Sequence, residues 1–304
     1  MPRIPIGHWI DVVIQWLLNH FGPLFDAIST VLLTLTNGVY DVLAAPHPLL
    51  LIVILAAIAA YVSHQAGLVV FTILAFLVID GMDLWVESMQ TLAVVIVAAT
   101  LAILIGVPLG IIAARNEQAR VILRPVLDFM QTLPVFVYLI PAVFFFGIGV
   151  VPGAVATTVF AIPPAVRLTE LGIRQVDQEV VEAAQAFGSR PSQVLREVQI
   201  PLAMPSIMAG INQVIMLALS MVVIAGMVGA AGLGAIVVRG VTELDIGAGF
   251  EGGLAVVILA VYLDRVTAAT GGHVERVRRG RSSKKQPSVT EPVEDGAAQR
   301  RSAP

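Results

Sequence analysis

Side chains that commonly carry out chemistry are sparse in this sequence. It has no cysteine, which excludes disulfides, thiolate nucleophiles and cysteine metal sites. The histidines, at positions 8, 20, 47, 64 and 273, show no HExxH spacing. A Walker loop needs a lysine after its glycines to bind nucleotide phosphates, and the only lysines are Lys284 and Lys285. We therefore predict no catalytic residue, no metal site and no cofactor, and we expect any ATP hydrolysis to occur on a partner chain.

The charged stretch at residues 180–207, VVEAAQAFGSRPSQVLREVQIPLAMPSI, lies between two long apolar runs. Four of its apolar side chains recur at helical spacing: Val180, Ala183, Ala184 and Phe187. Gly188 is suited to the left-handed conformation that ends a helix. Ser189 is the expected N-cap of a second helix, with Pro191 in its first turn. The stretch therefore predicts a short helix, a sharp bend and another short helix.

The first of these helices has the properties of a plug for a groove on another protein. Small side chains at Ala183 and Ala184 allow a second backbone to approach closely, and Glu182 offers a charge to a basic partner. A helix pair of this kind can also serve only to link the two apolar runs. The residues by themselves leave both interpretations open.

The composition indicates a membrane protein. Of the 304 residues, 57% are hydrophobic and only 13% are charged, and the mean hydropathy is +0.89. A soluble domain would leave much of that apolar surface facing water. The net charge of −3 is small and gives little information about partners.

The uncharged runs can be divided by the roughly 20 residues that cross about 30 Å of hydrocarbon as a helix. The core spans predicted in this way are residues 89–114, two helices within 129–166 that flank a turn at 147–153, the first part of 205–238 before the glycine-rich GMVGAAGLG, and 249–268. In residues 48–80, a polar turn from Ser63 to Gly67 favours two short helices over one tilted helix. We expect about seven spans in total. The GxxxG pairs at Gly106 and Gly110, and at Gly249 and Gly253, allow close helix packing.

The two ends of the chain differ from the spans. Residues 1–47 have apolar side chains at helical spacing and a break at Gly22 and Pro23, which is typical of amphipathic helices at a membrane interface. A charged start and a small-residue cleavage site are missing, so we expect no signal peptide. Residues 271–304 are polar, and we expect a disordered tail that contacts anionic lipid rather than nucleic acid.

The arginines predict the orientation, because Lys and Arg are enriched in short cytosolic loops. Arginines are concentrated in residues 115–124, in 167–196 and from 276 onward, whereas the opposite loops contain only Arg239. We therefore expect the charged stretch and the C-terminus in the cytosol, and the N-terminus outside.

The spacing within the charged stretch resembles the EAA loop of ABC importer permeases. Glu182, Ala183 and Ala184 are followed after three residues by Gly188, and after nine more by VQIP, which ends at Pro201. Val198 and Ile200 depart conservatively from the usual Ile and Leu. The resemblance implies a coupling helix that inserts into an ATPase subunit, with these coupling residues: Glu182, Ala183, Ala184, Phe187, Gly188, Val198, Ile200 and Pro201.

Residues from about 85 to 268 are similar to the glycine betaine/L-proline permease subfamily, for example in DFMQTLPVFVYLIPAVFFFGIGVVPG and IPLAMPSIMAGINQVIMLALSMVVIAGMVGAAGLG. The resemblance implies an all-α polytopic bundle with a type I ABC importer permease core, in the inner membrane of a prokaryote. It also implies two permease copies, two ATPases and an external substrate-binding protein. The expected division is an extracytoplasmic segment (1–47), two accessory spans (48–84), a five-span core (85–270) with its loop at about 178–201, and a cytosolic tail (271–304).

Aromatic rings can hold a quaternary ammonium, which has no hydrogen to donate. The predicted pathway residues are Pro134, Phe136, Tyr138, Met204 and Met208. The same side chains can instead face lipid or neighbouring helices. Choline, carnitine, ectoine and proline stay open as substrates. An ion-coupled secondary transporter or an intramembrane enzyme would need mid-span ionisable or catalytic residues, and neither is evident.

Overall fold

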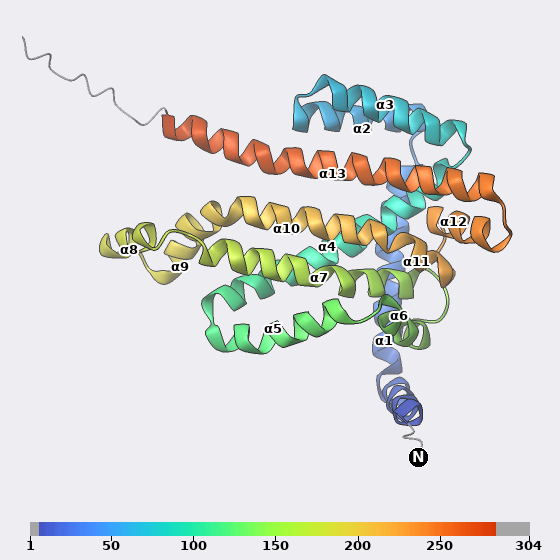
Figure 1. The fold of residues 1–304 in the computed structure, drawn as a ribbon, viewed down its shortest axis with the longest axis horizontal. Coiled ribbons are helices and arrows are strands. Elements are labelled where there is room, and N and C mark those ends of the chain that lie inside the picture. Colours follow the sequence, from blue (N-terminus) through green and yellow to red (C-terminus); the bar gives the residue numbers. More distant parts are fainter. Residues whose placement is uncertain (1–5, 284–304) are drawn as a thin grey trace, which may run out of the picture.

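The computed structural model describes residues 6–283, and side-chain surroundings for residues 7–269. This part of the chain is helical and contains no strand (Figure 1). The helices are α1 (Ile6–Ala44), α2 (Pro48–Ser63), α3 (Ala66–Gly81), α4 (Trp85–Arg115), α5 (Glu117–Thr132), α6 (Val135–Phe146), α7 (Val150–Arg174), α8 (Gln178–Ala186), α9 (Pro191–Gln193), α10 (Ile200–Ser220), α11 (Val222–Met227), α12 (Leu233–Thr242) and α13 (Ile246–Ser283). A π-helical segment, η1 (Val194–Gln199), joins α9 to α10.

The core of the fold consists of α4, α7, α10 and α13, and Figure 1 shows the last three running side by side. Two glycines bring α4 against α7. A Cβ at Gly106 would lie 2.5 Å from Ala165 Cβ, and one at Gly110 would lie 2.6 Å from Thr169 Cβ. Carbon atoms do not approach that closely, so only glycine permits this packing. The first GxxxG pair is therefore used inside the chain.

Small residues also join α7 to α10. A Cβ at Gly172 would lie 2.6 Å from Ser206 Cβ, and one at Gly210 would lie 3.1 Å from Leu168 Cβ. Helix α7 is thus enclosed between α4 and α10, and 67% of its most apolar stretch is buried. It is the central helix of the bundle.

Helices α2 and α3 form a hairpin packed on α13. Its turn lies at His64, which has φ 53°, and Gln65, as the sequence predicted. Phe76 of α3 is fully buried, and its ring centroid lies 5.2 Å from that of Tyr262. The Tyr262 hydroxyl donates a 3.2 Å hydrogen bond to the Leu55 carbonyl. Each helix has 16 residues, so its length of about 24 Å is less than the thickness of the hydrocarbon core.

The first of the two spans predicted within residues 129–166 is not a straight helix. The chain bends by 94° between α5 and α6. Pro134 accounts for the break, because a proline disfavours helical geometry at the preceding residue, and Leu133 is extended (φ −69°, ψ 134°). The prediction followed the absence of charge and missed this break. The second predicted span is α7, which continues beyond residue 166 to Arg174.

Helix α1 is continuous over 39 residues, so the interruption predicted at Gly22 and Pro23 is wrong. The apolar spacing continues on both sides of the proline, and loss of one helical hydrogen bond does not end the helix. In Figure 1, α1 crosses the direction of α7 and α10. Leu32 anchors it by packing with Val97 of α4 and Val151 of α7. Only 11% of its most apolar stretch is buried, so most of its surface faces away from the bundle.

The number of spans differs from the prediction of about seven. Within residues 6–283, five helices are long and apolar enough to cross a membrane, or six if α5 and α6 together form one span. Helices α2 and α3 are shorter than a full span, whereas α1 has the length and hydropathy of one. These three helices account for the difference between seven and six, and the count of five also leaves out the bent pair of α5 and α6.

The glycine-rich segment after α10 forms a compact turn, as predicted. Helix α11 ends at Met227 and α12 begins at Leu233. The turn is tight, since a Cβ at Gly226 would lie 2.4 Å from the carbonyl carbon of Gly234. The Leu233 N–H donates a 2.9 Å hydrogen bond to the Thr91 hydroxyl, which fixes the turn on α4.

The predicted crossing at residues 249–268 lies within α13. This helix continues to Ser283, so the disorder predicted for the tail is wrong over residues 271–283. The remainder of the predicted tail, 284–304, lies outside the described residues.

Candidate functional site

Helix α8 contains the first half of the charged stretch. The Asp177 carboxylate caps its start by accepting a 2.9 Å hydrogen bond from the Glu179 N–H. After the helix, Gly188 adopts φ +83°, the left-handed conformation predicted for it. The Ser189 N–H then donates a 3.1 Å hydrogen bond to the Ala184 carbonyl, which closes the last turn. The bend is therefore determined by local backbone interactions.

The second helix begins one residue later than predicted. Arg190, not Ser189, is the N-cap of α9, and its N–H donates a 2.9 Å hydrogen bond to Gln193 Oε1. Ser189 lies instead in the bend, where its N–H closes the last turn of α8. Pro191 occupies the first turn, as predicted.

The remainder of the stretch is anchored in the bundle. Leu195 of η1 is buried and packs with Ile173 of α7 and Ala203 of α10. Three of the predicted coupling residues are half-buried at this joint: Val198, Ile200 and Pro201. They connect the loop to the start of α10.

One face of α8 is apolar and exposed. Phe187, its C-cap, is 92% exposed, and Val180 and Ala183 are also exposed, whereas Ala184 is half-buried. Covering a phenylalanine side chain typically contributes about 1.5–3 kcal/mol. This face, defined by Val180, Ala183 and Phe187, is a small exposed apolar surface at one end of the fold.

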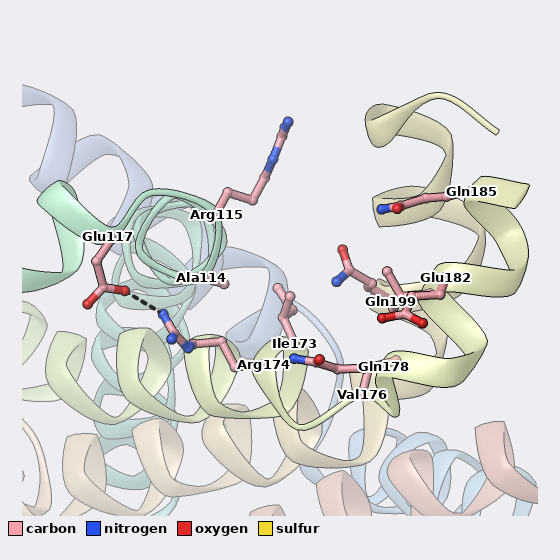
Figure 2. Close-up of a pocket in the computed structure, with 11 residues that line it drawn as sticks. Ala114, Arg115, Glu117, Ile173, Arg174, Val176, Gln178, Glu182, Gln185 and Gln199 are labelled. Carbon is pink, nitrogen blue, oxygen red and sulfur yellow. Dashed lines mark hydrogen bonds and ion pairs between the residues drawn. The ribbon is translucent and has the colours of Figure 1, made fainter. Parts of the chain in front are cut away.

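The opposite face of α8 lines a cavity of about 440 Å³. Glu182 and Gln185 lie on one side of it, and Arg115 and Arg174 on the other (Figure 2). Glu182 therefore does not lie on the exposed apolar surface that contains Phe187.

Ion pairs join α5 to α7 beside this cavity. Glu117 accepts hydrogen bonds from Arg174, at 3.0 Å, and from Arg120, and these bonds lower the pKa of its carboxyl group. Asp128 pairs with Arg167 further along the same helices. The pairs are exposed and contribute little to stability because solvent screens them. They orient α5 after its sharp turn from α4.

The predicted pathway residues fall into two groups: Pro134, Phe136 and Tyr138 in or just before α6, and Met204 and Met208 in α10. Pro134 and Phe136 are exposed, and Tyr138 is half-buried. Tyr138 belongs to a packed cluster that meets the end of α10 at Met221. Met221 lies about 20 Å along the helix from Met208. The five residues therefore do not form one site.

Two adjacent residues of α10 with amide side chains, Asn212 and Gln213, were not among the predicted site residues. Asn212 Nδ2 donates a 2.9 Å hydrogen bond to Asp264, and the Thr267 hydroxyl donates one of 2.6 Å to Asn212 Oδ1. Gln213 is exposed, and among the described residues its side chain has no hydrogen-bond partner. The sequence signal for them was the occurrence of two adjacent amide side chains within the uncharged run at 205–238.

Residues 106–276 match the family described as "Binding-protein-dependent transport system inner membrane component". The chain belongs to this family. The match extends from α4 into α13 and includes the whole charged loop. As a member, the chain is a multi-pass membrane transport protein, in agreement with its long apolar helices.

Relatives within this permease family match nearly the whole chain. The glycine betaine transport system permease protein OpuAB of Bacillus subtilis is 50% identical over 267 residues, covering 88% of this chain and 94% of the relative. The glycine betaine/proline betaine transport system permease protein ProW of Escherichia coli is 47% identical over 269 residues, covering 88% and 75%.

A solved structure shows the same fold. A chain of the inward-facing MetNI methionine ABC transporter matches with a TM-score of 0.55 at 22% identity, covering 62% of this chain and 92% of that chain. The predicted fold class, an all-α membrane bundle with a type I ABC importer permease core, is confirmed.

Proposed function

We propose that this chain is the permease subunit of an ATP-driven importer for osmoprotectants of the glycine betaine and proline betaine type. OpuAB and ProW are named as permeases for these compounds, and their similarity extends over 88% of the chain. The substrate is then a small zwitterion that bears a quaternary ammonium and a carboxylate.

The proposal rests on the exposed loop that α8, Gly188 and α9 form together. A separate ATPase docks on the surface that contains Phe187, whose 92% exposure calls for a partner. Movement of α8 reaches α7 and α10 through Leu195, which packs between them. The chain's only lysines lie at positions 284 and 285, which supports nucleotide binding on a separate chain.

The complete importer contains two copies of this chain, two ATPases and an external binding protein. The arginine distribution supports a cytosolic α8 and C-terminus and an extracytoplasmic N-terminus in a prokaryotic inner membrane. Helix α1 then crosses the bundle near the end opposite to α8, where it is available to brace a second copy.

Reconstitution of the chain in proteoliposomes, together with an ATPase and a binding protein encoded beside it, tests the proposed function. We expect uptake of labelled glycine betaine that requires ATP. Uptake driven by an ion gradient without the ATPase would contradict the proposal and favour a secondary transporter. ATP-dependent uptake of labelled choline, carnitine, ectoine or proline without uptake of glycine betaine would overturn the substrate assignment alone.

A further inference from the structure

The exposed face of α10 differs in composition from that of α4. Along α10 the exposed side chains recur every three or four residues: Pro205, Ala209, Gln213, Met216 and Ser220. On α4 the exposed side chains include Ile96, Leu104, Ile105 and Ile112, which are large and aliphatic. The α4 face is suited to lipid. The α10 face, defined by its five exposed residues, carries small or polar side chains and one large apolar side chain, Met216.

Gln213 is the most polar member of the α10 face and lies deep within the span. It is about 20 Å along the helix from Ile200, where α10 begins. Its neighbour Asn212 points toward α13 and has both amide atoms hydrogen-bonded, whereas Gln213 has no partner among the described residues. An unpaired amide facing hydrocarbon is costly, so Gln213 faces water or another polar group in the assembled protein.

The position of Gln213 on α10 places it beside α7. Gly210, one turn earlier on the same side of the helix, packs against Leu168 of α7. Ser206, a further turn away, packs against Gly172 of α7. Since α7 is the central helix, Gln213 adjoins the middle of the bundle and not its outer rim.

We propose that Gln213 lines the translocation pathway and that its carboxamide N–H group donates a hydrogen bond to the carboxylate of the zwitterionic substrate. The assignment rests on the proposed function, which makes the substrate a carboxylate. A glutamine side chain has two N–H donors and no charge. It can therefore orient the substrate carboxylate while binding it less tightly than a bidentate arginine would. Weak binding suits a pathway residue, because the substrate must move on.

Thiol labelling in the assembled importer tests whether Gln213 faces water. The chain has no cysteine, so Gln213→Cys introduces a unique thiol into it. The matched control is Leu104→Cys, exposed on α4 about 17 Å from the same end of the bundle. A charged methanethiosulfonate reagent requires a water-exposed thiolate, so we expect it to modify Gln213→Cys about tenfold faster.

Two labelling results would overturn the assignment. Equal rates at the two positions would place Gln213 in lipid. Oxidative cross-linking of Gln213→Cys between two copies, without reaction with the aqueous reagent, would place it in a sealed contact between permeases.

Uptake by Gln213→Leu tests the hydrogen bond to substrate. We expect ATP-driven uptake of glycine betaine to fall about tenfold, because a charge-assisted hydrogen bond is lost, while ATPase binding is retained. Leu104→Ala should leave uptake unchanged. Full uptake by Gln213→Leu would show that the residue makes no contact with substrate.

Failure of this inference can be separated from failure of the proposed function. If the unmodified importer takes up no glycine betaine, the proposed function fails, whatever the labelling shows. If the unmodified importer is active and Gln213→Cys labels no faster than Leu104→Cys, only the assignment of Gln213 fails.

Discussion

Asn212 of α10 and Asp264 of α13 are joined by a side-chain hydrogen bond of 2.9 Å. Thr267 completes the network through its 2.6 Å hydrogen bond to Asn212. These polar groups lie between α10 and α13, so their mutual pairing keeps α13 in a defined register on α10. Helix α10 also continues directly from the charged loop, which ties the position of α13 to that loop.

Asp264→Ala is predicted to weaken the contact between α10 and α13. We expect the unfolding free energy to fall by about 1–3 kcal/mol, because the Asn212 amide loses its acceptor in a part-buried position. Unfolding of the purified chain in detergent measures the change. Arg265→Ala is the control, since Arg265 is exposed and lies 3.9 Å from Asp264, and it should have little effect. Equal destabilisation by both variants would rule out the hydrogen bond as the link.

Phe187→Ser is predicted to uncouple the permease from its ATPase without unfolding it. Loss of about 1.5–3 kcal/mol of burial corresponds to roughly 10–150-fold weaker ATPase binding. Binding of the isolated ATPase to the permease measures this, and ATP-driven uptake should fall in parallel. Ile148→Ser is the control, because Ile148 is 81% exposed but lies between α6 and α7 at the other end of the bundle. Unchanged ATPase affinity in Phe187→Ser would show that docking does not use this surface.

Gly188→Val is predicted to disturb the bend by backbone strain alone. A Cβ at Gly188 would meet no atom within 4 Å, but its φ of +83° is unfavourable for a β-branched residue. The left-handed conformation costs about 1–2 kcal/mol, which corresponds to roughly 5–30-fold weaker ATPase binding. Gly188→Asn should retain most of the affinity, because Asn tolerates this conformation. If the two variants bind equally well, the left-handed conformation is not needed for docking.

The bend after α8 was predictable from the sequence because local rules determine it. A left-handed glycine and a first-turn proline specify a helix end and a helix start within a few residues. The cap was misplaced by one residue because Ser189 belongs to the end of α8, and the residue types do not decide which of two neighbouring helix ends a residue joins.

Other features of the fold could not be predicted in this way, because they depend on contacts between distant helices or on residues that were not considered. Pro134 stands within an uncharged run, and counting charge hid the break that it causes. Gly106 and Gly110 display a spacing that suits either a dimer or a single chain, and only the fold assigns them to the contact of α4 with α7. Gln213 becomes distinctive only once the fold leaves it exposed beside α7.

The close packing of α4 on α7 predicts a destabilising substitution whose effect a second substitution should reverse. A Cβ at Gly106 would lie 2.5 Å from Ala165 Cβ, so Gly106→Ala should force the two helices apart. Overpacking of this kind typically costs about 1–3 kcal/mol, measurable as a lower unfolding free energy in detergent. Gly253→Ala is the control, because a Cβ there meets no atom within 4 Å, and the exchange in a helix should be neutral or slightly stabilising.

The paired exchange of Gly106→Ala with Ala165→Gly tests the cause. It removes the methyl group that obstructs the new Cβ and leaves only the Ile162 carbonyl, at 3.2 Å, as a close neighbour. We expect the double variant to recover more than half of the lost stability, since the two positions are in direct contact and their effects are not additive. Additive destabilisation by the two exchanges would mean that Gly106 and Ala165 do not meet and that α4 and α7 are packed differently.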